Sequence, residues 1–166
     1  MTPSSETAVV AGVDPGATIG WAVVRIPRHW LGGVIVRREL AEVLGCGATR
    51  DPGDAVGMLS RRGVERAWVE RASGGAYGLA RVGALLDSAW LGGWLAATLE
   101  QHVPLVIGVR AGDWRTVVAG RPSATDAMVA QALTSWARLP KRSNAHVRDA
   151  IGCAIGGAII GRRESG

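Results

Sequence analysis

The chain has 166 residues, 48% hydrophobic and 20% charged, so it can bury a core without disulfides or structural metals. Nineteen basic and fourteen acidic residues give a net charge of +5, and every basic residue except Lys141 is arginine, which favours a polyanionic partner. No signal peptide, transmembrane stretch or zinc-binding cysteine motif is evident, which favours a cytoplasmic protein without a membrane partner. We expect a single domain over residues 1–166, with its core between about 7 and 161.

The first third of the chain predicts an antiparallel meander. Apolar runs separated by turn residues predict three strands, at residues 7–13, 19–26 and 33–43. The motif Asp51-Pro52-Gly53-Asp54 predicts the start of a short helix that continues to about Arg62. A fourth strand is predicted over residues 64–70, and it ends in a polar, glycine-rich stretch.

The remaining two thirds alternate between helical and strand patterns. The predicted elements are a long amphipathic helix at 77–101, a fifth strand at 103–109, a short helix near 113–118, a helix capped by Ser123 that runs to about Trp136, and a last helix from about Asn144 to Ile160. Strands separated by a helix are expected to be parallel. The fold class predicted is therefore α/β, with a five-stranded mixed sheet and helices on both faces.

Two acidic residues end predicted strands. Asp14 follows the first strand and Glu70 closes the fourth, and parallel strands place their carboxyl ends at one edge of the sheet. If these two strands are neighbours, the two carboxylates lie side by side. For either acid alone, a solvated strand end or a turn former is the ordinary explanation.

A histidine and a third acid begin the last helix. His146 and Asp149 are three residues apart, which places them about 60° apart on one helical face. Small residues follow and allow the helix to approach the sheet closely; they are Gly152, Ala154, Gly156, Gly157 and Ala158. Three carboxylates beside a histidine favour a hard cation, Mg²⁺ or Mn²⁺. Two such ions can stabilise the attacking and leaving oxygens of phosphodiester hydrolysis.

Three segments together resemble the motifs of RuvC-type Holliday junction resolvases. The first is Val10-Ala11-Gly12-Val13-Asp14-Pro15-Gly16 followed by Gly20-Trp21-Ala22-Val23-Val24, the second is Val69-Glu70, and the third is Ala145-His146-Val147-Arg148-Asp149-Ala150. They occur in the family's order, and the resemblance covers about residues 9–158.

The resemblance implies a homodimer of ribonuclease-H-like subunits that makes paired, symmetric nicks in a four-way DNA junction. It implies that Asp14, Glu70 and Asp149 bind Mg²⁺ or Mn²⁺, with two ions per site. His146 would be a further ligand or would position the attacking water. Residues 77–101 match the family's long interface helix, where Trp90 and Trp94 share one face. Branch-migration or recombination proteins would be possible partners.

The predicted DNA contacts depart from the family pattern. Ser73 stands where the family commonly has an aromatic residue that stacks at the opened junction, and Tyr77 is a possible substitute. Arginines stand where the family has lysines after the fifth strand, whereas Asp126 takes the place of one lysine. The arginines predicted to contact phosphate, including two that flank the acids, are Arg71, Arg110, Arg115, Arg121 and Arg148.

Three other functions fit part of the pattern. Asp14-Pro15-Gly16-Ala17-Thr18 also resembles the first phosphate loop of sugar kinases and actin-like ATPases, but those proteins clamp nucleotide between two such domains. A ribonuclease-H-like nuclease acting on flaps or RNA–DNA hybrids would use the same acids. A non-catalytic junction-binding module would share the basic charge.

Overall fold

The computed structural model describes residues 6–35, 39–72 and 82–161 of the chain. Its sheet has the order β3-β2-β1-β4-β5. The strands are β1 (Thr7–Asp14), β2 (Ile19–Pro27), β3 (Glu42–Thr49), β4 (Arg66–Arg71) and β5 (Leu105–Arg110). The helices are the 3₁₀ helix η1 (Arg28–Gly32) and the α-helices α1 (Pro52–Ser60), α2 (Val82–Leu99), α3 (Ala111–Ala119), α4 (Asp126–Leu133) and α5 (Ala145–Ile160).

The strand pairing confirms the predicted mixed sheet. The first three strands form an antiparallel meander, whereas β4 pairs in parallel with both β1 and β5. The carboxyl ends of β1, β4 and β5 therefore lie at one edge, which we call the acidic edge because Asp14 and Glu70 end there.

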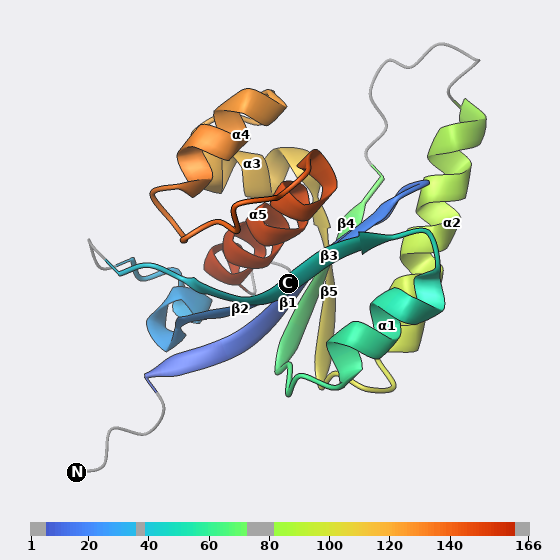
Figure 1. Ribbon diagram of the computed structural model, residues 1–166, viewed down its shortest axis with the longest axis horizontal. Helices are drawn as coiled ribbons and strands as arrows, with labels where there is room; N and C mark the ends of the chain where they lie inside the picture. The colour runs from blue at the N-terminus through green and yellow to red at the C-terminus, as the bar shows by residue number, and fades with distance from the viewer. Residues whose placement is uncertain (1–5, 36–38, 73–81, 162–166) are drawn as a thin grey trace.

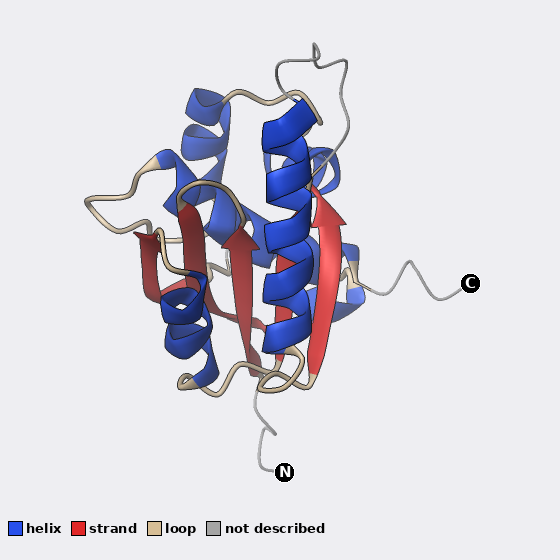
Figure 2. Cartoon of the chain, turned by 90° about the vertical axis from the view of Figure 1, so that its right-hand side faces the viewer, coloured by secondary structure: helices blue, strands red, loops and turns tan. Residues whose placement is uncertain are grey.

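Helices cover both faces of the sheet (Figure 1). On one face α5 lies over the central strands, with α3 and α4 beside it, around a core that includes Trp68, Trp114 and Ile155. On the other face α1 and α2 cover a second core that includes Leu59 and Leu99. In Figure 2 the long helix α2 lies in front of the sheet and crosses that second face.

Glycines on β1 and β2 let α5 approach the sheet. A Cβ atom on Gly12 would stand 2.0 Å from the carbonyl oxygen of Ala150, and one on Gly20 would stand 2.1 Å from that of His146. Any side chain at either position would push the backbone of α5 away. The predicted close approach is thus confirmed, but it depends on glycines of the strands as well as on small residues of the helix.

The prediction of a third strand at residues 33–43 is wrong. After β2 the chain forms η1, which is capped by Gly33 with a positive φ of 76°, and β3 begins only at Glu42. Two glycines inside β3 resemble a turn in the sequence, but each makes room for a neighbour. A Cβ on Gly45 would stand 2.4 Å from the Arg62 guanidinium, and one on Gly47 would stand 2.9 Å from the Trp21 ring.

Two details of the predicted helices are also wrong. Thr125, and not Ser123, caps α4, because its side chain accepts a hydrogen bond from the backbone N–H of Met128. That helix ends at Leu133 rather than at Trp136, whose indole N–H donates to the Val118 carbonyl. The last helix begins beside Asn144 as predicted, and the structure adds that Asn144 caps α5 by accepting from the N–H of Val147.

The outer face of α2 is apolar and uncovered in the chain as described. Exposed apolar residues recur on this face every four positions, at Val82, Leu86, Trp90 and Trp94. The exposed fractions of Leu86 and Trp90 are 63% and 72%. By length and composition alone α2 could cross a membrane, and 11% of it is buried. Leu95 and Leu99 nevertheless pack it into the core beneath, so α2 is part of this domain.

Candidate active site at the acidic edge

The register of β1 and β4 places two acids next to each other. Val13 pairs with Val69 in the parallel ladder, so Asp14 and Glu70 are the next residues on adjacent strands. Both side chains are mostly buried, and the Asp14 side chain is 13% exposed. The predicted meeting of the two carboxyl ends at one edge is therefore confirmed, and the strands are also neighbours, which the sequence had left open.

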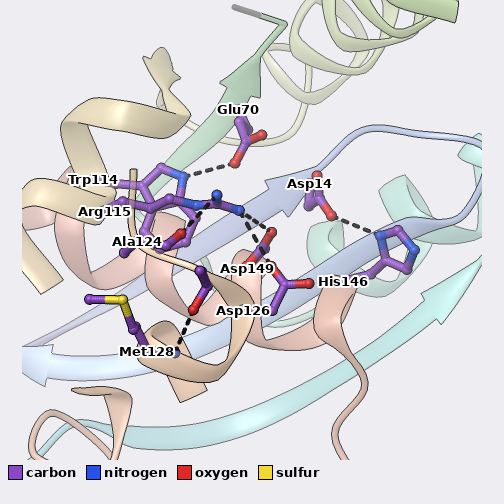
Figure 3. Close-up of polar contacts among 10 residues, drawn as sticks. Asp14, Glu70, Trp114, Arg115, Ala124, Asp126, Met128, His146 and Asp149 are labelled. Carbon is purple, nitrogen blue, oxygen red and sulfur yellow. Dashed lines mark hydrogen bonds and ion pairs between the residues drawn. The ribbon is translucent and has the colours of Figure 1, made fainter. Parts of the chain in front are cut away.

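Helix α5 adds the histidine and the third acid. His146 lies in its first turn, and the ring atom Nδ1 stands 3.0 Å from Oδ2 of Asp14 (Figure 3). Asp149 follows on the same helical face, and its side chain is 14% exposed. The structure thus brings all four residues to the acidic edge, whereas their chemical roles stay predictions.

Two consecutive residues of α3 each hold one of these acids (Figure 3). The indole N–H of Trp114 donates to Oε2 of Glu70 over 2.8 Å, and the guanidinium of Arg115 donates to Oδ2 of Asp149 over 2.9 Å. Arg115 also lies 3.9 Å from a carboxylate oxygen of Asp126. The side chains of Glu70 and Asp149 are therefore oriented by α3.

The Trp114 ring fits against glycines of α5. A Cβ on Gly152 would stand 2.4 Å from the ring, and a Cβ on Gly156 would stand 2.8 Å from the Cβ of Trp114. Because the ring is fully buried there, its N–H has a fixed position from which to meet Glu70. The small residues of α5 therefore leave room for the Trp114 ring of α3 as well as for close packing on the sheet.

Burial and mutual repulsion favour protons on these acids. Burial raises the pKa of Glu70 to about 7, and the neighbouring Asp14 carboxylate adds to the rise. Burial also raises the pKa of Asp149 to about 6, although Arg115 opposes the change. The pKa of Asp14 is raised by burial too, against the opposing effect of His146. A cation among these groups would relieve the cost of keeping them ionised.

The oxygen atoms of these three acids suit a hard divalent cation as ligands. Carboxylate oxygens from three residues are the ligands that Mg²⁺ and Mn²⁺ prefer. As the side chains stand, however, no three His, Cys, Asp or Glu residues in the described part of the chain are placed to hold an ion together. Glu70 is turned to Trp114 and Asp149 to Arg115. Binding an ion beside Asp14 therefore requires these two side chains to rotate.

Without metal, we expect the folded protein to lose stability as the pH rises from about 4.5 to 7. A carboxyl whose pKa is higher in the folded state holds its proton more tightly there than in the unfolded chain. Its stabilising effect is therefore complete at low pH and is lost as the pH rises past the pKa of the carboxyl in the folded state. For Glu70, whose pKa rises from 4.5 to about 7, this amounts to about 3 kcal/mol.

Thermal unfolding in EDTA between pH 5 and 8 measures this effect, with Glu70→Gln as the matched control. The melting temperature of the variant should depend less on pH and should exceed that of the wild type at pH 8. Mg²⁺ should raise the wild-type melting temperature more at pH 8 than at pH 5. Identical pH profiles for the two proteins would contradict the pKa assigned to Glu70.

The arginines predicted to contact phosphate lie in different settings. Arg115 faces Asp149, and Arg110 pairs with Asp113 through a contact of 2.9 Å. Arg148 is half-buried on α5 and donates to the Ser143 carbonyl. Arg121 is exposed in the loop after α3. DNA contact by each of them stays a prediction.

Arg71 lies on the other face of the sheet from the acids. A Cβ on Gly108 of β5 would stand 2.1 Å from Nε of Arg71, so the arginine side chain lies flat across that strand beneath α2. Ser73 and Tyr77, the predicted junction contacts, lie outside the described residues.

Sequence reasoning assigned no role to Trp114. The sequence indicates only that Trp114 is buried. Trp114 and Val118 are four residues apart and form the buried face of a short helix. That pattern predicts a core residue, which Trp114 is. The hydrogen bond to Glu70 depends on how α3 packs against α5, and no local pattern reveals such packing.

Comparisons with known proteins support the fold. No protein-family model and no curated protein sequence matches the chain. Among solved structures, the Thermus thermophilus RuvC in complex with a Holliday junction substrate matches with a TM-score of 0.61 at 20% identity, over 92% of this chain and 94% of that one.

Two further solved structures agree. Another Thermus thermophilus RuvC structure matches with a TM-score of 0.52 at 22% identity, over 91% of this chain and 93% of that one. The yeast mitochondrial Holliday junction resolvase Ydc2 matches with a TM-score of 0.50 at 12% identity, over 95% of this chain and 80% of that one. The fold is thus the ribonuclease-H-like fold of RuvC.

Proposed function

We propose that this chain is a metal-dependent endonuclease that resolves four-way DNA junctions by paired nicks. The observation that carries the proposal is the meeting of Asp14, Glu70, His146 and Asp149 at one edge of a RuvC-like sheet. Each of the three sequence motifs contributes at least one of these side chains to that edge. The basic charge of the chain suits a nucleic-acid substrate.

In this proposal Asp14, Glu70 and Asp149 hold Mg²⁺, or Mn²⁺ in its place, with two ions per site. The bound cations supply charge neutralisation for the attacking and leaving oxygens of the scissile phosphate. Asp14 fixes the His146 ring by accepting a hydrogen bond from Nδ1, which leaves Nε2 to accept a proton from the attacking water. Trp114 and Arg115 hold Glu70 and Asp149 in the metal-free structure, and in this proposal both carboxylates turn away from these donors when the ions bind.

The substrate class is tested by cleavage of a synthetic four-way junction beside a linear duplex, an RNA–DNA hybrid and a flap. Each substrate is incubated with Mg²⁺, Mn²⁺ or EDTA. We expect symmetric, metal-dependent nicks in the junction alone. Cleavage of the hybrid or flap instead would assign this site to another class of nuclease on the same fold.

One observation favours a different function, non-catalytic junction binding. The ion pair between Arg115 and Asp149 already supplies a positive charge where a metal would bind. A protein of that kind would bind the junction in the assay above and cut none of the substrates in any metal. The sequence retains all three carboxylates and the histidine, which is why we place catalysis first.

Paired nicks require two active sites, and we propose that the exposed face of α2 joins two copies of the chain. A two-fold dimer presents two identical sites to a two-fold junction. Leu86 and Trp90 protrude from α2, and an apolar face of this kind is costly to leave in water. A membrane is the poorer occupant, because the Ser88 hydroxyl bonds the Pro15 carbonyl and Leu95 is buried, which fixes α2 across the sheet.

We therefore expect the wild type to be a dimer and the double variant Leu86→Glu/Trp90→Glu to be a monomer. Two buried charges per subunit should raise the dimer dissociation constant by at least about a hundredfold. Sedimentation equilibrium measures this, and Met58→Glu on α1 is the matched control, because Met58 is also an exposed apolar residue. A monomeric wild type, or a variant that remains dimeric, would contradict the interface.

A further inference from the structure

The segment that joins α4 to α5, residues 134–144, carries an exposed row of cations. Arg138, Lys141 and Arg142 are all exposed, and the segment contains no acidic residue. Within the described residues, none of these three side chains forms an ion pair. The segment therefore adds three positive charges at one place on the surface, a large share of the net charge of +5.

The same segment is fixed to the domain by its other residues. The indole N–H of Trp136 donates to the Val118 carbonyl over 3.0 Å, and its ring meets that of Trp30 edge to face. Ala137 forms a β-bridge with Ala41, and Leu139 packs against the core. Apolar residues thus face inward while the cations face outward. A ligand bound by these cations would not have to order the segment first.

The segment also leads directly into the active site. The guanidinium of Arg148 donates to the Ser143 carbonyl over 2.7 Å, and Asn144 caps α5. Only three residues separate Arg142 from His146, so their Cα atoms lie at most about 14 Å apart. Phosphates of one DNA strand are spaced by about 3.4 Å along the helix axis, so this distance corresponds to about four of them.

These cations differ from the arginines closest to the acids. Arg115 faces Asp149 and Asp126, and Arg110 pairs with Asp113, so part of their charge is neutralised within the protein. Arg138, Lys141 and Arg142 face solvent with their full charge. A phosphate that reaches them has no protein carboxylate to displace.

We infer that this segment holds the DNA backbone on its way to the scissile phosphate, with Lys141 and Arg142 nearest the active site and Arg138 farther along the strand. The inference rests on the proposed function and names the part of the substrate that this surface contacts. The contact is with phosphates and is therefore independent of base sequence. It positions the strand, while the acids and His146 act on the scissile bond.

The test is the salt dependence of junction binding in EDTA, where no cleavage occurs. The double variant Lys141→Gln/Arg142→Gln removes two charges from the segment, and Arg61→Gln/Arg66→Gln removes two from the opposite edge of the sheet. Each lost phosphate contact lowers the slope of log K against log salt by about 0.9, so the segment variant should lose about 1.8 from the slope. Its affinity at about 50 mM salt should fall at least tenfold.

The control variant should keep most of the wild-type slope and affinity. Three of the four replaced side chains are exposed and Arg66 is half-buried, so the melting temperatures of both variants should stay close to that of the wild type. If the two variants bind with the same slope, the segment is not the backbone-binding surface, while the proposed function stands. If the wild type binds no DNA, the proposed function itself fails.

Discussion

Replacing Asp14 by Asn, Glu70 by Gln or Asp149 by Asn is expected to reduce the rate of junction cleavage about a thousandfold, with the junction dissociation constant changed by less than about threefold. Each variant removes one anionic ligand from the acidic edge, and a loss of that size corresponds to about 4 kcal/mol of transition-state stabilisation. Binding should persist because phosphate contacts by arginine and lysine dominate the affinity for DNA. Single-turnover cleavage and a binding titration on the same junction separate the two effects.

The three variants differ in what they do to the fold. Glu70→Gln is the cleanest, because an amide oxygen still accepts from Trp114 and the buried charge disappears. Asp149→Asn leaves Arg115, a side chain only 22% exposed, without its closest anion and should lower the melting temperature. His146→Ala should slow cleavage less than any acid variant, since the histidine is half exposed and solvent can accept the proton of the attacking water in its place. Near-normal rates in two of the three acid variants would contradict the assigned site.

Gly12→Ala is expected to damage stability and activity together. The new methyl group would stand 2.0 Å from the Ala150 carbonyl oxygen and 2.6 Å from the Ala154 nitrogen, both of them backbone atoms of α5. The helix must move, which we expect to cost about 3 kcal/mol and to lower the melting temperature by about 10 °C. Because α5 carries His146 and Asp149, a displacement of about 1 Å should also slow cleavage about a hundredfold.

Gly57→Ala is the control for that substitution. Gly57 lies inside α1, where a Cβ would make only an ordinary contact with Arg61, and the change should stabilise the helix by up to about 1 kcal/mol. Differential scanning calorimetry and the junction assay on both variants measure the two effects. If Gly12→Ala unfolds at the wild-type temperature and cuts at the wild-type rate, α5 does not depend on close approach to β1.

The sequence was informative where a local pattern has one structural solution. The apolar, β-branched run that ends at Asp14 and the later strand that ends at Glu70 predicted parallel strands because a helical pattern precedes the second of them, and parallel strands place their carboxyl ends at one edge. That the two strands are neighbours was only a condition of this prediction. The spacing of His146 and Asp149 and the small residues after them predicted a helix packed close to the sheet. These features were enough to place all four side chains at one edge.

Sequence reasoning failed where the role of a residue depends on contact with another residue far away in the chain. Gly45 and Gly47 resemble turn residues locally, but inside β3 they accommodate Arg62 and Trp21. The ion pair between the Arg115 guanidinium and Asp149 was not predicted, while the phosphate contact assigned to Arg115 stays a prediction. The basic segment after α4 has no periodicity, and its orientation follows only from the packing of Trp136 and Leu139. Each of these facts depends on tertiary contacts between residues far apart in the chain.

The most direct test of the central claim is a crystal structure of the protein grown with Mn²⁺, with the metal located by its anomalous scattering. Our account predicts a Mn²⁺ peak between the carboxylates of Asp14, Glu70 and Asp149. It also predicts that Glu70 has rotated away from Trp114 and Asp149 away from Arg115, and that the peak is lost in Asp14→Asn. A map with no Mn²⁺ at the acidic edge, and with Arg115 still paired to Asp149, would contradict a metal-dependent active site.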